Sequence, residues 1–270
     1  MKNMRYKFID GIDEETGQER HLHTLDGKPL IGTSGVLNVI AKPLTWWASG
    51  LAVTELGWSP IKDKDKRFIS KELRLPIAEK RLEEIKGMDA EEYLKTLDKG
   101  YYAHSKTLDK SATKGTNMHA ILEKICKRLP LSDREAEHPA AICFREWANK
   151  NIKRVISSEG HCYSEEYWLG GITDLVFEDM EGRIAIMDFK SSKEVYRTQL
   201  WQCAGYDLQI AENGIVDKEG NQICKLEKPI SYYAVFPFGA TNPEPEISYD
   251  TESAKEAFLA ALTIQNKLNN

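Results

Sequence analysis

The chain has 270 residues, of which 41% are hydrophobic and 29% are charged, and its formal net charge is −5. This balance is typical of a soluble globular protein with one large domain, or with one domain that carries a sizeable insertion. The acidic balance does not indicate a nucleic-acid binder, and it does not exclude one, because a local basic groove would be enough to contact phosphates.

Three features narrow the cellular context. No stretch approaches the roughly 20 apolar residues that a membrane helix needs, and the N-terminus M-K-N-M-R-Y-K-F-I-D has no apolar signal region. The five cysteines are odd in number, widely spread and without a C-x-x-C pair, which favours free thiols and argues against an iron–sulfur cluster. They are Cys126, Cys143, Cys162, Cys203 and Cys224. We therefore expect a cytoplasmic protein with no membrane partner.

The chain opens with two short predicted strands, Tyr6–Asp10 and His21–Leu25, followed by a turn at L-D-G-K-P. A small helix is expected after Thr33-Ser34, because serine is a good N-cap residue. Pro43 is then expected to open a second helix. His21 and His23 have a spacing that could suit a metal, but on a strand they are more often ordinary polar-face residues.

Residues 59–110 differ in character, since they are dense in lysine, glutamate and aspartate. Apolar residues at helical spacing predict two or three charged helices here, forming an insertion or a cap above a functional site. We expect a division into residues 1–110, with strands and a helical cap, and residues 111–270, the core. The two parts are expected to form one compact unit together.

The remaining chain alternates regular elements. The pattern predicts helices at 114–129, 137–151, 198–211 and 252–268, and strands at 153–157, 161–168, 171–178, 183–190 and 230–237. Strands interleaved with helices in this order predict an α/β fold with a mixed central sheet flanked by helices on both faces.

The candidate catalytic residues lie on a predicted β-hairpin. G-G-I-T-D-L-V-F (170–177) and I-A-I-M-D-F-K-S-S (184–192) flank a polar turn that contains Gly182. Folding the second strand back places Asp174 opposite Met187 or Asp188, so the two carboxylates should lie within about 5–8 Å. Asp188 and Lys190 are two residues apart and therefore point to one face.

The strand that holds Asp188 and Lys190 is otherwise apolar on both sides, which is typical of a central strand. Charged groups at such a position are costly unless they are paired or bind a metal. Hydrolysis of a phosphodiester requires a deprotonated water and stabilisation of negative charge on the phosphate, and hard cations held by carboxylates provide both. A neighbouring lysine can orient the water or neutralise the charge.

These residues resemble the PD-(D/E)XK nuclease superfamily, in particular its RecB-like exonuclease branch. The acid followed by D-x-K-[ST] is Asp174 and then D-F-K-S at 188–191. The upstream G-x-x-x-H corresponds to G-T-N-M-H at 115–119, and the later Q-x-x-x-Y to Q-C-A-G-Y at 202–206. The resemblance covers residues 114–210, and the first 56 residues are similar to phage-encoded members.

The resemblance implies a restriction-endonuclease-like core and a role for each matching residue. Asp174, Asp188, His119 and the carbonyl of Phe189 would bind one or two Mg²⁺ or Mn²⁺ ions. Lys190 would serve the nucleophilic water, and Gln202 and Tyr206 would position Lys190 or the DNA backbone. The implied activity is a DNA exonuclease in recombination, repair or phage replication. The expected partner is linear single- or double-stranded DNA, with a recombination or single-strand-binding protein as a further candidate.

Other interpretations stay open. Asp188 and Lys190 could form a purely structural ion pair. The chain could be a non-catalytic DNA-end-binding module on a nuclease fold, or a structure-specific endonuclease. Glu123, one turn after His119, could support a metal site or be a solvated surface residue. Glu165 and Glu166 are more typical of a strand surface.

Overall fold

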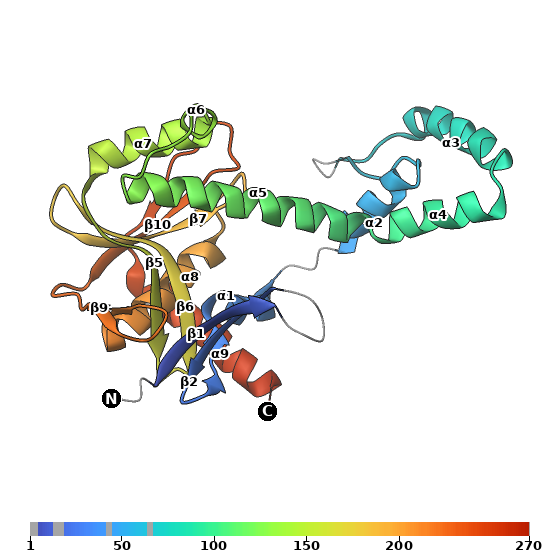
Figure 1. Ribbon diagram of the computed structural model, residues 1–270. Coiled ribbons are helices and arrows are strands. Elements are labelled where there is room, and N and C mark those ends of the chain that lie inside the picture. The colour runs from blue at the N-terminus through green and yellow to red at the C-terminus, as the bar shows by residue number, and fades with distance from the viewer. Residues whose placement is uncertain (1–4, 13–18, 42–44, 64–66, 270) are drawn as a thin grey trace. The chain divides into compact units, whose positions relative to one another are not determined.

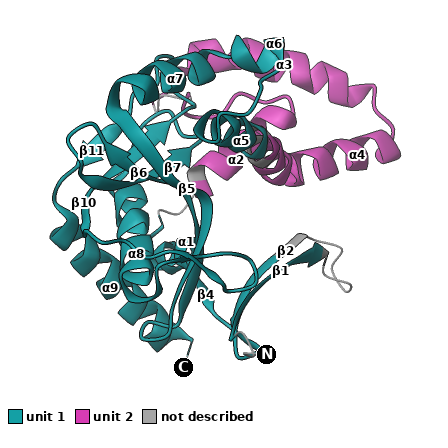
Figure 2. Ribbon diagram, turned by 60° about the vertical axis from the view of Figure 1, so that its left-hand side comes forward, with its two compact units in different colours: residues 1–41, 115–270 teal, residues 42–114 magenta. Residues whose placement is uncertain are grey.

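The computed structural model describes residues 5–12, 19–41, 45–63 and 67–269. The chain divides into two compact units, shown in Figure 2. The first unit contains residues 1–41 and 115–270, and the second contains residues 42–114. Every residue that the sequence analysis assigns to the site belongs to the first unit.

A mixed sheet forms the centre of the first unit, as the sequence predicts. Its strands follow the order β11-β10-β7-β6-β5-β8-β9, and β4 pairs with β6. Strand β7 runs parallel to β10 and antiparallel to β6, so it is a central strand. The bounds are β4 Ile31–Gly32, β5 Ile152–Ser164, β6 Leu169–Asp179, β7 Ile184–Lys190, β8 Ile215–Val216, β9 Gln222–Cys224, β10 Ile230–Pro237 and β11 Glu246–Ser248.

Helices cover both faces of this sheet (Figure 1). One face packs against α1 (Thr33–Val36), η1 (Leu37–Ile40), α8 (Arg197–Asn213) and α9 (Thr251–Leu268). The other packs against the C-terminal part of α5 (Ala103–Cys126) and against α7 (Pro139–Asn151), which follows the short α6 (Asp133–Ala136). Alternate residues of β7 enter the two cores, Ile186 on one side and Met187 on the other. This double burial explains why the strand is apolar on both sides.

The two predicted N-terminal strands are present as β1 (Tyr6–Ile12) and β2 (Glu19–Leu25), which form a small antiparallel sheet with β3 (Lys28–Pro29). They lie in the first unit, whereas the division expected near residue 110 grouped them with the charged helices. The physical reason is a separate apolar cluster in which Tyr6 and Leu25 pack with Val216 of the large sheet. Burial of these side chains joins β1 and β2 to the core.

Three predicted boundaries are wrong. The helix expected from Lys114 begins at Ala103, so that α5 is 24 residues long. The strands expected at 153–157 and 161–168 are one strand, β5, whose pairing with β6 shifts register near Val155. The first small helix begins at Thr33 with Gly32 as its N-cap, so Ser34 does not cap it.

The second unit is helical and charge-rich, in agreement with its composition. It contains α2 (Thr45–Glu55), α3 (Lys71–Lys86), α4 (Ala90–Tyr101) and the start of α5. Ion pairs one helical turn apart, such as Lys95 with Glu91 at 2.6 Å, lie along its helices. Pro43 lies outside the described residues, and the role of this unit as a cap stays a prediction. Among the described residues, no helix is long and apolar enough to cross a membrane.

His23 is buried, contrary to its assignment as a polar-face residue. The hydroxyl group of Tyr6 lies 2.6 Å from His23 Nδ1 and 3.3 Å from His161 Nδ1. Burial, followed by the charge of His161, lowers the pKa of His23 from 6.5 to about 4. The neutral imidazole therefore belongs to the folded state.

This pKa predicts a loss of stability in acid. Because the folded-state pKa of His23 is depressed, its contribution is complete above pH 6.5 and is lost as the pH falls towards 4. The free energy of unfolding of the wild type should therefore fall more steeply over this range than that of His23→Gln, whose amide does not titrate. Urea unfolding at pH 7 and pH 4.5 measures the difference, and parallel losses in the two proteins would contradict the assignment.

Candidate active site

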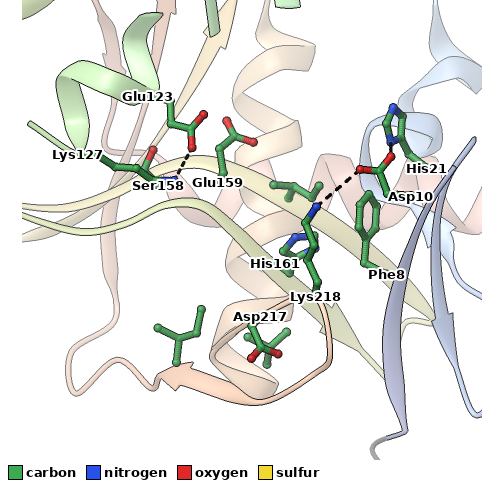
Figure 3. Close-up of a pocket in the computed structure, with 13 residues that line it drawn as sticks. Phe8, Asp10, His21, Glu123, Lys127, Ser158, Glu159, His161, Asp217 and Lys218 are labelled. Carbon is green, nitrogen blue, oxygen red and sulfur yellow. Dashed lines mark hydrogen bonds and ion pairs between the residues drawn. The ribbon is translucent and has the colours of Figure 1, made fainter. Parts of the chain in front are cut away.

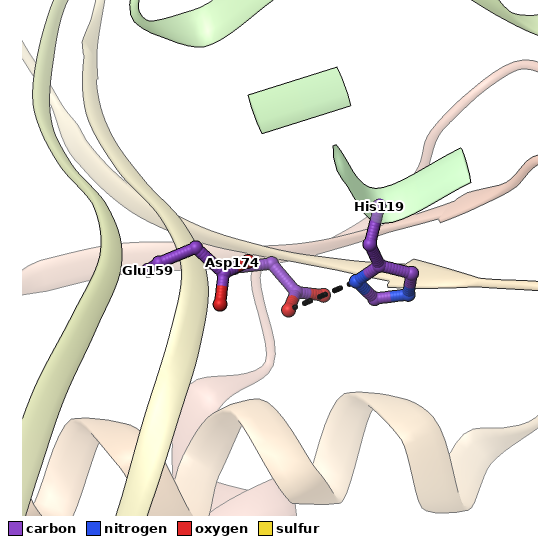
Figure 4. Close-up of side chains that lie close together, drawn as sticks. All are labelled: His119, Glu159 and Asp174. Atoms are coloured by element: carbon purple, nitrogen blue, oxygen red, sulfur yellow. Dashed lines mark ion pairs between the residues drawn. The ribbon is translucent and has the colours of Figure 1, made fainter. Parts of the chain in front are cut away.

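A histidine and two acids converge from three elements of the first unit (Figure 4). His119 comes from α5, Glu159 from β5 and Asp174 from β6. One ligand atom from each lies within 4.8 Å of the other two, and His119 Nδ1 is 3.4 Å from Asp174 Oδ1. The side chain of Asp174 is only 13% exposed. The placement of His119 beside Asp174, expected from G-x-x-x-H, is thus present in the fold.

The register of the sheet brings Glu159 to this point. Ser158 pairs with Leu175 and Gly160 pairs with Thr173, so Glu159 stands opposite Asp174. Glu159 has a φ of 56°, in the left-handed region that most L-residues avoid. A strained backbone position of this kind is frequently found at functional sites. This backbone conformation belongs to Glu159, an acid opposite β6 that the sequence did not single out.

Strand β7 adds a second pair of charges. Lys190 Nζ lies 2.7 Å from Asp188 Oδ2, and Asp188 is 2% exposed. Apart from this ion pair, Oδ2 receives no hydrogen bond from the described residues. A buried carboxylate oxygen with one cationic neighbour retains capacity for a further positive partner.

The hairpin register agrees with the prediction. Leu175 pairs with Met187, and continuing the pairing by one residue sets Asp174 opposite Asp188. The backbone N–H of Phe189 donates a hydrogen bond to Asp174 Oδ2 at 2.5 Å. Because the N–H and C=O of one strand residue point to the same side, the Phe189 carbonyl also faces β6. Its expected position as an oxygen ligand is therefore compatible with the backbone.

Gln202 and Tyr206 lie on the face of α8 that packs against the sheet. Gln202 Nε2 is 3.2 Å from Asp188 Oδ1 and 2.7 Å from the Tyr206 hydroxyl. Both residues are buried, at 8% and 6% exposure. Gln202 therefore contacts Asp188 directly and Tyr206 contacts Gln202, and their expected role in positioning Lys190 or the DNA backbone stays a prediction.

The electrostatics of the cluster reflect crowded negative charge. Burial and then the charge of Asp174 raise the pKa of Glu159 to about 7. Burial also raises the pKa of Asp188. Burial lowers the pKa of Lys190 and of His119, but the neighbouring acids outweigh it and raise both values. Lys190 is therefore a cation in the folded protein, and the carboxylates around it lack full charge compensation.

The donor set suits a divalent cation. Carboxylate oxygens and an imidazole nitrogen are common metal ligands, and a dication would relieve the repulsion among the acids. The ligand atoms of His119, Glu159 and Asp174 lie within 4.8 Å of one another, close enough that the three could hold one ion. Asp188 stands opposite Asp174 in the sheet, and the backbone of Phe189 is hydrogen-bonded to Asp174, so both residues adjoin this cluster.

The other acids weighed from the sequence have ordinary partners. Glu123 forms an ion pair with Lys127, in the turn directly after α5, and Glu165 lies 2.7 Å from Arg5. Neither of them belongs to the cluster of His119, Glu159 and Asp174. The only sequence signal for Glu159 is an acid before Gly160, in the gap between two predicted strands, and this signal is weak.

Removal of the Gln202 amide should impair the site through Asp188. In Gln202→Met, Asp188 Oδ1 and the Tyr206 hydroxyl lose their amide partner, which should cost about 1–3 kcal/mol of stability. The affinity of the site for a divalent cation should fall about 10- to 100-fold per folded molecule, as is typical when a support of a metal-site residue is lost. Titration with Mn²⁺ and urea unfolding separate these effects, and a loss of stability alone would show a merely structural role.

Comparisons with protein families and with curated proteins identify no relative of this chain. No protein family model matches the chain, and no curated protein matches it significantly.

Proposed function

We propose that this chain is a divalent-cation-dependent nuclease that hydrolyses phosphodiester bonds in DNA, built on the core of the PD-(D/E)XK nucleases. One observation carries the proposal. His119, Glu159 and Asp174 meet from three elements, and Asp174 stands opposite Asp188 of the Asp188–Lys190 pair at the end of a central strand. A structural ion pair would not require three further ionisable groups at the same place.

The proposed ion is Mg²⁺ or Mn²⁺, in one or two copies. His119, Glu159 and Asp174 would hold it, with Asp188 and the Phe189 carbonyl as further ligands. When bound, the ion lowers the pKa of a coordinated water molecule and neutralises negative charge on the phosphate. Compared with the set expected from the sequence, Glu159 is an addition.

The protein's own groups supply the remaining chemistry. Water attacks phosphorus, a P–O bond of the diester breaks, and the departing oxygen takes up a proton. Lys190, cationic and held by Asp188, would orient the water or balance the charge that grows on the phosphate. Gln202 would hold Asp188 so that the ammonium group of Lys190 stays in place.

An exonuclease is the favoured type, and this preference rests on the RecB-like resemblance. The intact acids and lysine favour catalysis over a non-cutting DNA-end-binding module. Recombination, repair or phage replication in the cytoplasm is the proposed setting, with linear DNA as the substrate.

Labelled DNA tests the proposal. Purified protein is incubated with end-labelled linear single- and double-stranded DNA and with circular single-stranded DNA, with Mn²⁺ or with EDTA. We expect degradation of a linear substrate only with the ion, and no nicking of the circle. Nicking of the circle would identify an endonuclease, and intact DNA under all conditions would contradict a nuclease function.

A further inference from the structure

A pocket of about 550 Å³ lies beside the cluster and shares Glu159 with it (Figure 3). All the residues that line it belong to the first unit. Its walls come from β1 and β2, from the C-terminal part of α5, from β5 and from the segment after β8. A pocket of this volume is large enough for one nucleotide and too small for a DNA duplex.

Aromatic rings form one side of the pocket. The ring of Phe8 lies 4.7 Å from that of His161 and 6.0 Å from that of His21, and the planes of Phe8 and His21 are nearly parallel, at 3°. Phe8 and Asp10 are two residues apart on β1, so they share the face of the strand that lines the pocket. A planar ligand could stack on this surface with little dependence on its identity.

The charges of the pocket do not suit a bare phosphate. Lys218 Nζ lies 3.6 Å from Asp10 Oδ2 and 5.6 Å from the centre of the Phe8 ring. His21 Nδ1 also contacts Asp10, at 3.1 Å, and Lys127 pairs with Glu123. With Glu159 at the inner end, the acids outweigh the lysines. The net negative charge of the pocket would repel a free phosphate ion. It would not repel a neutral ligand that has a flat ring and hydrogen-bond donors.

We infer that this pocket receives the unpaired nucleoside next to the scissile phosphate, with its base on Phe8. The inference rests on the proposed nuclease function and adds the recognition of one nucleoside beside the site of cleavage. Glu159 belongs to the cluster and also lines the pocket, so a nucleoside held in the pocket lies next to the cluster. Carboxylates such as Asp10 can accept hydrogen bonds from amino groups of the base.

Binding of small ligands tests this inference without cleavage. In Mg²⁺, the affinities of the protein for deoxyadenosine monophosphate, for deoxyribose 5-phosphate and for inorganic phosphate are measured by NMR titration, and none of these ligands contains a diester bond to cleave. The nucleotide should bind at least about tenfold more tightly than the sugar phosphate, since stacking on an aromatic ring typically contributes this much or more. Inorganic phosphate should bind most weakly.

Two substitutions on β1 form a matched pair. Phe8→Leu keeps an apolar side chain against the small N-terminal core but removes the ring, and should weaken the nucleotide about tenfold while leaving the sugar phosphate unchanged. Ile9→Leu alters the next residue, which is 49% exposed and points to the opposite face, and should change neither affinity. Equal melting temperatures of the two variants would show that the small sheet of β1 and β2 is intact in both.

The outcomes separate the two proposals. Nucleotide binding that depends on Phe8, in a protein that cleaves no DNA, would support the pocket and overturn the nuclease function. Metal-dependent cleavage together with nucleotide binding that is equal in wild type and Phe8→Leu would support the nuclease and overturn the pocket. If Phe8→Leu proves unstable, Phe8→Met, which also removes the ring and keeps an apolar side chain against the small N-terminal core, replaces it, and nucleotide affinity equal to that of the wild type would overturn the pocket.

Discussion

Lys190→Ala should reduce DNA cleavage by about a hundredfold or more, which is a typical cost of losing one preorganised charge contact in a transition state. Lys190 is held as a cation 2.7 Å from Asp188, beside the acids that are proposed to bind the ion. Affinity for DNA should change far less, because other phosphate contacts remain. Metal affinity should be retained or rise, since a repelling positive charge has been removed.

The alternative interpretation, a structural ion pair, predicts a different result for the same variant. Asp188, 2% exposed, would lose its cationic partner, and the main loss would be stability. Melting temperature, DNA affinity and single-turnover cleavage are therefore measured on one preparation. Cleavage per folded molecule within a few-fold of wild type would show that Lys190 is not catalytic.

Asp174→Asn should abolish the stabilisation of the protein by Mn²⁺. An ion at a hundred times its dissociation constant stabilises a folded protein by about 2.7 kcal/mol, which for a chain of this size corresponds to a rise in melting temperature of roughly 5–10 °C. The amide oxygen of the introduced asparagine can still accept the hydrogen bond from the Phe189 N–H, so the hairpin should remain intact.

Glu256→Gln is the matched control for this experiment. It removes one carboxylate from an exposed position on α9, outside the cluster, and should respond to Mn²⁺ like the wild type. Thermal melts of the three proteins in EDTA and in Mn²⁺ give the comparison. Equal stabilisation of Asp174→Asn and wild type would remove Asp174 from the metal site.

The hairpin of the site could be predicted from the sequence because strand geometry is strict. The two-residue period fixes Asp188 and Lys190 on one face, and a short turn leaves only two choices for the residue opposite Asp174. The observed pairing, with Leu175 opposite Met187, agrees with one of them. The mixed sheet with helices on both faces follows from the same patterns.

Other features depend on contacts that no local pattern reveals. Glu159 reaches the cluster because β5 continues through a residue with positive φ, where a break between two strands was expected. The N-terminal strands join the core through a contact of Tyr6 and Leu25 with Val216, about 200 residues away in the chain. The burial of Tyr206 likewise arises only when α8 packs on the sheet.

The central claim is that the cluster of His119, Glu159 and Asp174 binds a divalent cation and that this ion is required to cut DNA. Its most direct test is the single-turnover rate of cleavage of end-labelled linear DNA by wild type, Asp174→Asn and Glu256→Gln, each with saturating Mn²⁺ and with EDTA. We predict cleavage by wild type and Glu256→Gln in Mn²⁺ only, and a rate for Asp174→Asn that is lower by about a hundredfold or more. Cleavage by Asp174→Asn at the wild-type rate, or cleavage by wild type in EDTA, would contradict the claim.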